Sequence, residues 1–579
     1  MIALQVWAPA ASKVEAEVGG RRVLLTRGER GWWRGDHALA QPGLEYGFRL
    51  DDDDQLLPDP RSPWQPRGVH GPSRFVDHSA FAWTDQGWQP PPLGAGILYE
   101  VHVGTFTPGG TFDAAIERLD HLRALGVTHV ELLPVNQFPG ARGWGYDGVA
   151  LFAPQNTYGG PDGLKRLVDA CHARGLAVIL DVVYNHLGPS GNYLGRFGPY
   201  FSDRHRTPWG QAVNLDGAGS DEVRRFFCDN ALGWLRDYRV DGLRLDAVHA
   251  FVDTSARHFL EQLADEVDAL EVERGRHYAL IAESDLNDPR VVGERSAGGY
   301  GLDAQWSDDF HHALHSTMTG ERDGYYGDFA GLPDLAKALR DAFVYDGRYA
   351  PSRDRTHGRS PAGLPCRRFL AYLQNHDQIG NRARGDRSSR LMSTGRLKVA
   401  AALVLGSPFL PMLFQGEEWG ASTPFPYFTD HEDRALGEAV SRGRREEFAG
   451  FGWKPEDVPD PQEPATFEQA RLDWSELERD PHRQVLDWYR RLIALRRQVP
   501  SLGAVGRVGG LDVRFDAAAG WLVVSRGEVT IAANVGARQR VPLCGRPRRQ
   551  LLLASEPDIR PPEGDALELP ADSVALLGG

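Results

Sequence analysis

From about residue 97 onward, apolar runs of strand length alternate with stretches whose apolar residues recur at helical spacing. The run Ile97–Val103 is followed by Ile116, Leu119 and Leu122 on one helical face, and then by Val127–Leu133. Nearly continuous apolar runs are typical of strands buried on both faces. Their alternation with helices therefore predicts a parallel sheet covered by helices.

The same alternation continues and gives eight predicted strands in all. The remaining six are residues 177–183, 241–248, 278–283, 302–306, 369–375 and 409–414. Between them, Ser220 has the character of an N-cap for a helix whose first turn carries Asp221 and Glu222. A last amphipathic helix is predicted around Val485–Arg497. Eight repeats of this kind predict an α/β fold, a closed (β/α)8 TIM barrel.

Short alternating segments with frequent Gly and Pro flank the barrel on both sides. We expect residues 1–92 to form an N-terminal β-sandwich of immunoglobulin-like type and residues 503–579 a small C-terminal β domain. The barrel would then occupy residues 93–502. Three irregular stretches interrupt it, at 187–219, 320–365 and 416–481. Insertions that follow barrel strands commonly build the walls of an active site.

Charge and composition exclude several classes of function. The chain has 65 basic and 79 acidic residues and a net charge of −14, which disfavours nucleic acid or an anionic membrane as a partner. Its four scattered cysteines (Cys171, Cys228, Cys366 and Cys544) predict buried thiols in a reducing compartment. No signal peptide or apolar run of membrane-spanning length is recognisable. We expect a soluble, cytoplasmic monomer.

Polar residues gather at the ends of four predicted strands. In chain order these endings are Asp181–His186, Arg244–Asp246, Glu283–Asp285 and Gln374–Asp377. Because the carboxyl ends of parallel barrel strands meet at one rim, the four endings predict an active site there. Arg244 and Asp246 fall on one face of their strand, which by itself fits either a structural ion pair or the wall of a polar site.

Three of these residues are carboxylates whose combination suits glycoside hydrolysis or transfer: Asp246, Glu283 and Asp377. Such chemistry needs one carboxylate to attack the anomeric carbon and another carboxyl group to protonate the leaving oxygen. An ordinary glutamate is ionised at neutral pH, so the acid needs a pKa raised by about two units. We expect crowding by the other carboxylates to raise it.

The four endings are also recognisable as a set. Residues 181–186, 242–247, 282–285 and 374–377 resemble, in order and spacing, the four signature regions of the α-amylase superfamily. The resemblance covers the whole barrel. It implies retention of configuration through a covalent intermediate, with Asp246 as nucleophile, Glu283 as acid/base and Asp377 as the third carboxylate that holds sugar hydroxyls.

The resemblance also implies roles for residues around the reacting sugar. Arg244 would orient the nucleophile and keep it ionised. His186 and His376 would hydrogen-bond the sugar in the −1 subsite, and Tyr146, between glycines in residues 143–148, would be the aromatic platform beneath that ring. His249 would be a structural neighbour of the nucleophile.

An N-terminal sandwich before such a barrel is similar to that of branching enzymes, debranching enzymes and trehalohydrolases. In amino-acid sequence, residues 283–290, 305–312 and 374–381 resemble the trehalohydrolase family. That likeness implies hydrolysis of the α-1,4 bond next to the terminal trehalose unit of maltooligosyltrehalose. Four residues would then lie on or near the leaving-group side: Asp308, Asp309, His311 and Gln378.

Two other functions stay open at this point. A glycogen branching enzyme would pass through the same glycosyl-enzyme, because hydrolysis and transfer differ only in whether water or a sugar hydroxyl intercepts it. A glucan-binding protein on an inactive barrel is a third reading, which the intact carboxylate trio disfavours.

No cofactor or metal is expected. The GxGxxG at residues 143–148 has no strand directly before it and no helix after it, so a dinucleotide site is rejected. His311 and His315 are four apart on a predicted helix but lack a third ligand at matching spacing, which favours a surface or substrate-side position over zinc. Asn185 matches a position that binds calcium in many secreted amylases, but only scattered acids such as Asp203 follow it.

Overall fold

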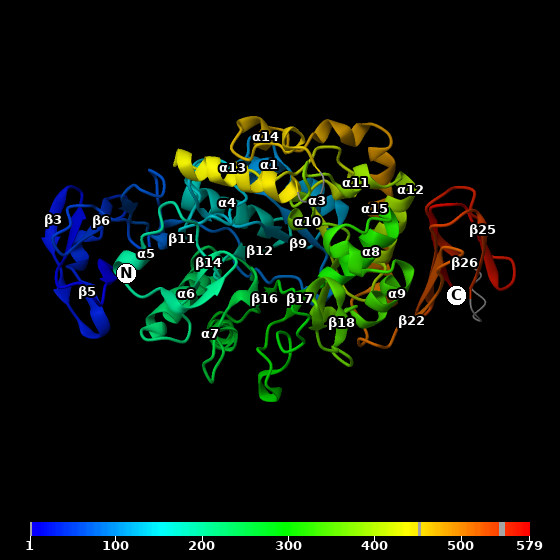
Figure 1. The fold of residues 1–579 in the computed structure, drawn as a ribbon, viewed down its shortest axis with the longest axis horizontal. Helices are drawn as coiled ribbons and strands as arrows, with labels where there is room; N and C mark the ends of the chain where they lie inside the picture. The colour runs from blue at the N-terminus through cyan, green and yellow to red at the C-terminus, as the bar shows by residue number, and fades with distance from the viewer. Residues whose placement is uncertain (1–2, 450–452, 544–549) are drawn as a thin grey trace.

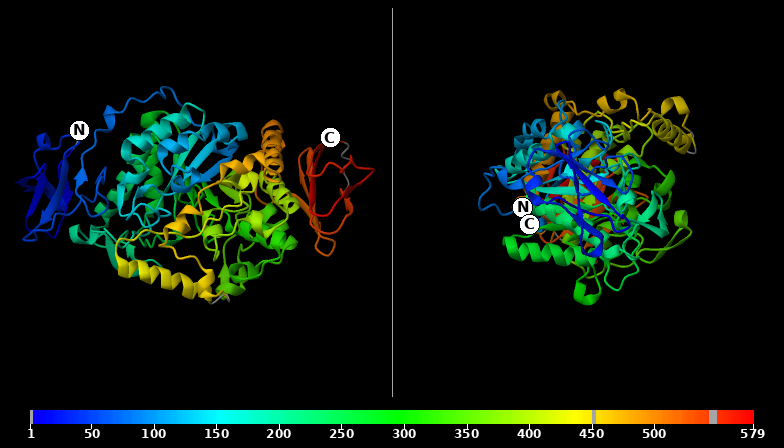
Figure 2. Two further views of the ribbon diagram at one scale, coloured as in Figure 1. Left: turned by 90° about the horizontal axis from the view of Figure 1, so that it is seen from above. Right: turned by 90° about the vertical axis from the view of Figure 1, so that its left-hand side faces the viewer.

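The computed structural model describes residues 3–449, 453–543 and 550–579. The protein is elongated, with a closed barrel in the middle, small β-sheets of the N-terminal region at one end and a C-terminal sheet at the other (Figure 1). The view from above in Figure 2 shows the same order of parts along the long axis.

Eight parallel strands close the barrel, as the sequence predicts. Around the barrel the order is β12–β15–β16–β17–β20–β21–β8–β9, with β9 pairing β12 to complete the ring. Every residue of these strands is buried. Their bounds are β8 Leu98–Val101, β9 His129–Leu132, β12 Ala177–Val182, β15 Gly242–Leu245, β16 Ala279–Ala282, β17 Ala304–Trp306, β20 Phe369–Tyr372 and β21 Leu410–Phe414.

Helices surround the barrel. Outside the three irregular stretches, the helices of seven or more residues are α3 Leu119–Leu125, α4 Gly160–His172, α6 Ser220–Asp237, α7 Phe259–Arg274, α8 Asp308–Thr319, α12 Thr394–Leu405 and α15 His482–Gln498. One detail of the prediction is wrong: Ser220 is the first helical residue of α6, and Gly219 is its N-cap. The chain enters this helix at φ 79°, a left-handed conformation that glycine adopts without steric cost.

Small sheets flank the barrel. In the N-terminal region β1 Gln5–Trp7, β5 Trp32–Arg34 and β4 Thr26–Arg27 form one sheet, and β3 Arg21–Leu24, β2 Val14–Val18, β6 Glu45–Leu50 and β7 Ser73–Arg74 form another. Near the C-terminus, β22 Asp512–Asp516, β23 Trp521–Arg526, β24 Val529–Asn534, β28 Ser573–Gly578 and β26 Gln550–Ala554 pair in that order, beside a ribbon of β25 Gln539–Pro542 and β27 Ala566–Leu569. The domain boundaries at 92 and 502 stay a prediction.

The three irregular stretches carry secondary structure of their own. Residues 187–219 hold α5 Leu194–Phe197 and a hairpin of β13 Phe201–Thr207 and β14 Gly210–Val213. Residues 320–365 hold α9 Leu332–Asp341 and a hairpin of β18 Arg348–Ala350 and β19 Arg355–His357. Residues 416–481 hold α13 Arg434–Ala449 and α14 Pro464–Glu468.

A buried polar cluster ties the segment before the barrel to the barrel itself. His172 at the end of α4 contacts Asp85 through Nδ1 at 2.8 Å and Asp241, the residue before β15, through Nε2 at 2.9 Å. The ring of Trp88 stacks on His172, and its Nε1 donates to Asp241 at 2.8 Å. Asp85 and Trp88, which precede the first barrel strand, therefore both contact His172 of α4.

No helix among the described residues is long and apolar enough to cross a membrane. Cys171, Cys228 and Cys366 are buried free thiols, whereas Cys544 lies outside the described residues.

Candidate active site

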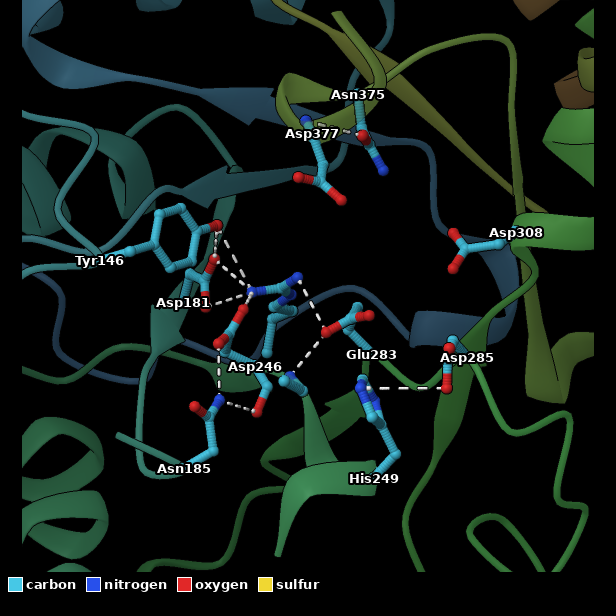
Figure 3. A network of polar contacts seen from close by, with 12 residues as sticks. Tyr146, Asp181, Asn185, Asp246, His249, Glu283, Asp285, Asp308, Asn375 and Asp377 are labelled. Atoms are coloured by element: carbon cyan, nitrogen blue, oxygen red, sulfur yellow. Dashed lines mark hydrogen bonds and ion pairs between the residues drawn. The ribbon is translucent and has the colours of Figure 1, made fainter. Parts of the chain in front are cut away.

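Arg244 on β15 is a buried cation that pairs with three carboxylates, Asp181, Asp246 and Glu283, which are labelled in Figure 3. Its Nη1 donates to Oδ1 of Asp246 at 2.8 Å and to both carboxylate oxygens of Asp181 at 2.9 and 2.8 Å. Asp181 is the register partner of Arg244 on the neighbouring strand β12. The guanidinium also lies over the ring of Trp306, 4.4 Å from its centroid. Arg244 is thus a paired cation inside the barrel, and Asp246 is one of its partners.

Glu283, which follows β16, lies against the other side of the same guanidinium. Its Oε2 is 3.6 Å from Nη2 of Arg244 and accepts a hydrogen bond from the backbone N–H of Ala247 at 2.6 Å. Burial raises the pKa of Glu283 well above its usual value. Arg244 opposes this rise, and the negative charges of Asp246, Asp308 and Asp377 add to it. A glutamate in this setting can hold a proton at neutral pH, as a general acid must.

The crowding expected from the sequence contributes to that pKa, but burial is the larger cause. Burial favours the neutral form because the carboxylate loses its hydration.

Asn185 fixes the other side of Asp246. Its Nδ2 donates to Oδ2 of Asp246 at 2.7 Å and to the backbone oxygen of the same residue at 3.0 Å. The side chain of Asn185, which matches a calcium-binding position of secreted amylases, therefore hydrogen-bonds the carboxylate of Asp246. Among the described residues, no group of three or more His, Cys, Asp and Glu is placed to hold a metal ion.

Tyr146 and His376 connect this network to the first barrel strand. The Tyr146 hydroxyl donates to Oδ2 of Asp181 at 2.6 Å and contacts Nε2 of His376 at 2.7 Å. Nδ1 of His376 contacts Oε1 of Glu100 at 2.5 Å. Both ring nitrogens of His376 therefore have protein partners, and its ring stacks on Tyr146 with the centroids 5.1 Å apart.

His186 lies beside Asn185. Its Nδ1 contacts the side-chain oxygen of Asn185, and its ring stacks on Trp209 with the centroids 5.1 Å apart and the planes 8° from parallel. Trp209 comes from the turn between β13 and β14 and is 48% exposed. Burial lowers the pKa of His186, so a neutral imidazole faces the site.

Asp377 lies in the first turn of a short helix, α10 His376–Gly380, which follows β20. Its carboxylate is exposed and points toward the space that Asp308 and Glu283 also face (Figure 3). Gln378, one residue later, is buried and its Oε1 accepts from the backbone N–H of Asn375 at 3.1 Å. The Gln378 side chain therefore caps α10.

Asp308 and Asp309 are neighbours in sequence but face different surroundings. Asp308 accepts a hydrogen bond from the Tyr372 hydroxyl, and burial raises its pKa to about 7 against the lowering effect of that bond, with Asp377 adding to the rise. Oδ2 of Asp309 accepts from the backbone N–H groups of Val344 and Tyr345, each at 2.8 Å. Asp308 lies in the site, whereas Asp309 holds the chain at 344–345.

His311 and His315 are buried in α8, in contrast to the surface position allowed by the sequence. Nδ1 of His311 contacts the backbone oxygen of Leu373 at 2.7 Å and its Nε2 contacts the hydroxyl of Tyr326 at 3.0 Å. His315 contacts Glu321 at 2.5 Å. The ring nitrogens of His311 and His315 thus bond to other protein groups in the interior. None of these partners is Asp246, Glu283 or Asp377.

Two residues beside the carboxylates were missed as site residues. Asp285 lies next to Glu283 and Asp308 (Figure 3) and pairs with Arg353 of the stretch 320–365 at 3.0 Å. Glu100 lies within the apolar strand β8. In the sequence, Glu100 is distinguished as the one carboxylate in an otherwise apolar strand. Asp285 belongs to the strand ending Glu283–Asp285, one of the four that predict the site.

Comparison with known proteins places the chain in a family. Residues 71–199 match the family model of the alpha amylase catalytic domain. The malto-oligosyltrehalose trehalohydrolase of Arthrobacter ramosus is 55% identical over 542 residues, covering 92% of each chain. The enzyme of the same name from Rhizobium sp. strain M-11 is 50% identical over 586 residues, covering 99% of this chain and 97% of its own.

The chain belongs to the malto-oligosyltrehalose trehalohydrolase family. A crystal structure of a candidate alpha amylase from Salmonella typhimurium has the same fold, with a TM-score of 0.91, 39% identity and coverage of 100% of this chain and 97% of that one. Like these trehalohydrolase relatives, the protein is a glycoside hydrolase built on a TIM barrel.

Proposed function

We propose that the protein hydrolyses the α-1,4-glucosidic bond next to the terminal trehalose unit of maltooligosyltrehalose, releasing trehalose and a maltooligosaccharide. The observation that carries this proposal is the 50–55% identity, over nearly the whole chain, to relatives named for that activity. The charge network around Arg244 supplies groups suited to the chemistry.

In the first step, an oxygen of Asp246 attacks the anomeric carbon while the bond to the glycosidic oxygen breaks. Glu283 gives its proton to that oxygen, which leaves as a hydroxyl group of trehalose. One guanidinium contacts both carboxyl groups, which suits the separation of about 5–5.5 Å that a retaining mechanism requires.

In the second step, water replaces trehalose and attacks the same carbon. Glu283, now ionised, takes a proton from that water, and the bond to Asp246 breaks to release the maltooligosaccharide. Hydrogen bonds to Asp246 from Arg244 and Asn185 orient it and disperse its charge, which makes it a competent leaving group as well as a nucleophile.

The sugar bound at −1 is surrounded by Tyr146, His186 and Asp377. Tyr146 would stack beneath the ring, and the exposed carboxylate of Asp377 would accept bonds from ring hydroxyls as positive charge develops. On the leaving-group side, Asp308 is the predicted residue best placed to bind trehalose, since its carboxyl group faces the same space as Glu283 (Figure 3).

The decisive test is incubation of the protein with maltooligosyltrehalose, followed by separation of the products. Release of free trehalose supports the proposal. If instead only unmodified maltooligosaccharides are cut, or nothing is cut, the proposed substrate is wrong. A shift in the colour of iodine-stained amylose, caused by new α-1,6 branches, would identify a branching enzyme, because the same glycosyl-enzyme can be intercepted by a sugar hydroxyl.

A further inference from the structure

Glu100 makes two hydrogen bonds to a single residue on the far side of an intervening strand. Its Oε1 is 2.5 Å from Nδ1 of His376, and its Oε2 accepts from the backbone N–H of His376 at 3.0 Å. Glu100 lies on β8 and His376 follows β20, with β21 between the two strands in the barrel. Glu100 is 1% exposed and His376 3%. Both oxygens of the Glu100 carboxyl group therefore bond to His376.

Counting protons along the chain of contacts fixes the charge on His376. The hydroxyl of Tyr146 has one proton, which it donates to Asp181 at 2.6 Å. At its 2.7 Å contact with Nε2 of His376, this hydroxyl must then accept, so Nε2 carries a proton. A carboxylate at 2.5 Å from Nδ1 requires a proton there as well. With both nitrogens protonated, the ring is an imidazolium.

We propose that Glu100 is a positioning residue of the active site, which holds His376 as an imidazolium and through it orders Tyr146, Asp181 and Arg244 around the nucleophile Asp246. The sign of the charge alternates from Glu100 through His376, Asp181 and Arg244 to Asp246, with the neutral Tyr146 bridging His376 and Asp181. The inference rests on the proposed function for the role of Asp246. It assigns Glu100 no contact with substrate.

The surroundings of His376 agree with a positive ring. Burial tends to lower the pKa of His376, but Glu100 and then Asp377 outweigh it, and the pKa is raised. The titratable and charged groups that face the ring are Glu100, Tyr146, Asp377, Arg244 and His102. Arg244 opposes a second positive charge, and burial lowers the pKa of His102 to about 4, so His102 is neutral.

Glu131 offers a matched control on the neighbouring strand. It is the register partner of Glu100 on β9 and is 1% exposed. Within the described residues its Oε2 has no hydrogen-bond partner, and burial followed by repulsion from Glu100 raises its pKa well above the usual value. Burial and the neighbouring charge thus favour the neutral acid form of Glu131, so glutamine there preserves the charge and removes no bond to His376.

Glu100→Gln keeps the shape of the side chain and removes its charge. Its amide can donate to Nδ1 of His376, which then becomes a neutral imidazole with its proton on Nε2. Loss of that positive charge disfavours the ionised form of Asp181, whose pKa burial already raises to about 6 against the effect of Arg244. Once Asp181 is protonated, Arg244 and Tyr146 lose the acceptor that orients them.

The first experiment measures trehalose release from maltooligosyltrehalose against pH for the wild type, E100Q and E131Q. For E100Q we expect kcat to fall by about tenfold to a hundredfold with KM changed by less than about threefold, since Asp308 and Asp377, the carboxylates proposed to bind the sugars, keep their contacts. The acid limb of kcat/KM should move up by about half a pH unit or more. E131Q should match the wild type in both. An E100Q enzyme with wild-type kcat and an unmoved acid limb overturns the proposal.

The second experiment reads the charge on His376 directly. The 15N chemical shifts of the imidazole nitrogens are recorded in wild-type protein labelled at histidine, with His376→Gln to assign the signals. Two protonated nitrogens near pH 7 support the proposal, and a neutral ring overturns it, even where E100Q fails to fold. This readout needs no substrate. Failure of the wild type to release trehalose would therefore sink the proposed function without deciding the state of His376.

Discussion

The backbone N–H of Ala247 donates a 2.6 Å hydrogen bond to Oε2 of Glu283. Ala247 directly follows Asp246, and it adopts φ 42° and ψ 50°, a left-handed conformation that few non-glycine residues occupy. The chain thus turns sharply after Asp246, the proposed nucleophile, and directs a backbone donor at Glu283, the proposed acid/base. Strain of this kind is held in place by the surrounding structure and is common at active sites.

Substitutions of Ala247 should separate strain from the hydrogen bond. Ala247→Gly keeps the N–H and accepts the positive φ, so we expect turnover within a few-fold of the wild type and stability within about 1 kcal/mol. Ala247→Val places a β-branched side chain in this conformation and should cost about 1–3 kcal/mol, with a clear loss of turnover. Thermal unfolding and trehalose release test both; equal behaviour of the two variants contradicts the argument.

The two catalytic carboxylates should respond differently to an activated substrate. Asp246→Asn and Glu283→Gln should each lower turnover of maltooligosyltrehalose by about two to four orders of magnitude. A glycosyl fluoride needs little protonation to leave, so Glu283→Gln should form the glycosyl-enzyme from it readily. Asp246→Asn should not. Detection of the covalent adduct by mass spectrometry checks this, and near-normal turnover of either variant on the natural substrate would disprove the assignment.

The charge of Asp308 should help to set the pH at which kcat/KM falls on the basic side of the pH profile. The negative charge of Asp308 helps to raise the pKa of Glu283, after burial and Asp246. Activity is lost as the pH rises through that pKa, because the acid must be protonated. Asp308→Asn removes the charge and lowers the pKa of Glu283, so the basic limb of kcat/KM should shift to lower pH.

Asp309→Asn is the matched control for Asp308→Asn. It weakens the bonds to the backbone at 344–345 and should lower the free energy of unfolding by about 1–3 kcal/mol while leaving the basic limb in place. If Asp309→Asn moves the basic limb and Asp308→Asn does not, Asp308 is not the residue whose charge raises the pKa of Glu283.

The cluster around His172 should make stability depend on pH. Burial tends to lower the pKa of His172, but hydrogen bonds to Asp241 and Asp85 raise it above its usual value. The stabilisation is therefore complete below about 6.5, the unfolded value, and is lost as the pH rises through the raised folded value. The opposing carboxylate Asp85 has a lowered pKa despite burial, so its contribution is present above about 4 and is lost in acid.

His172→Gln should accordingly destabilise most between about pH 4 and 6.5, by about 1–3 kcal/mol, because it removes the cation between two buried carboxylates. The loss is limited because Asp85 keeps its pair with Arg239 and Asp241 keeps Arg276 at 3.6 Å. His277→Gln is the comparison, since the His277 side chain is 54% exposed and its pairs with Glu271 and Asp303 contribute about 0–1 kcal/mol. Chemical denaturation at several pH values gives both numbers. A loss for His172→Gln that does not vary with pH would contradict the assigned charge.

The barrel could be predicted from sequence because eight mostly apolar runs of strand length alternate with stretches of helical spacing. The carboxylates at the strand ends were predictable for the same reason, since a parallel barrel brings those ends together whatever the intervening loops do. Asp246, Glu283 and Asp377 needed only this topology to be grouped, whereas their roles stay proposals.

Other features depend on contacts that a linear pattern does not encode. Asp308 and Asp309 begin the same helix, and only the packing against Tyr372 and the chain at 344–345 decides which of them faces the site. Glu100 finds its partner 276 positions away. Ser220 was a reasonable N-cap by residue type, but the preceding glycine takes that position because the chain enters the helix in a left-handed turn.

The reach of Glu100 to His376 has a consequence for how the protein is made. During translation the first barrel strand, β8, emerges from the ribosome long before β20. Glu100 therefore has no His376 to pair with until more than half of the barrel has been synthesised. Contacts between such distant segments slow folding and expose intermediates to aggregation. A nascent chain ending before β20 would lack the imidazolium and the third carboxylate. Catalytic competence should therefore arise late in synthesis and in a single step, when the ring of strands closes.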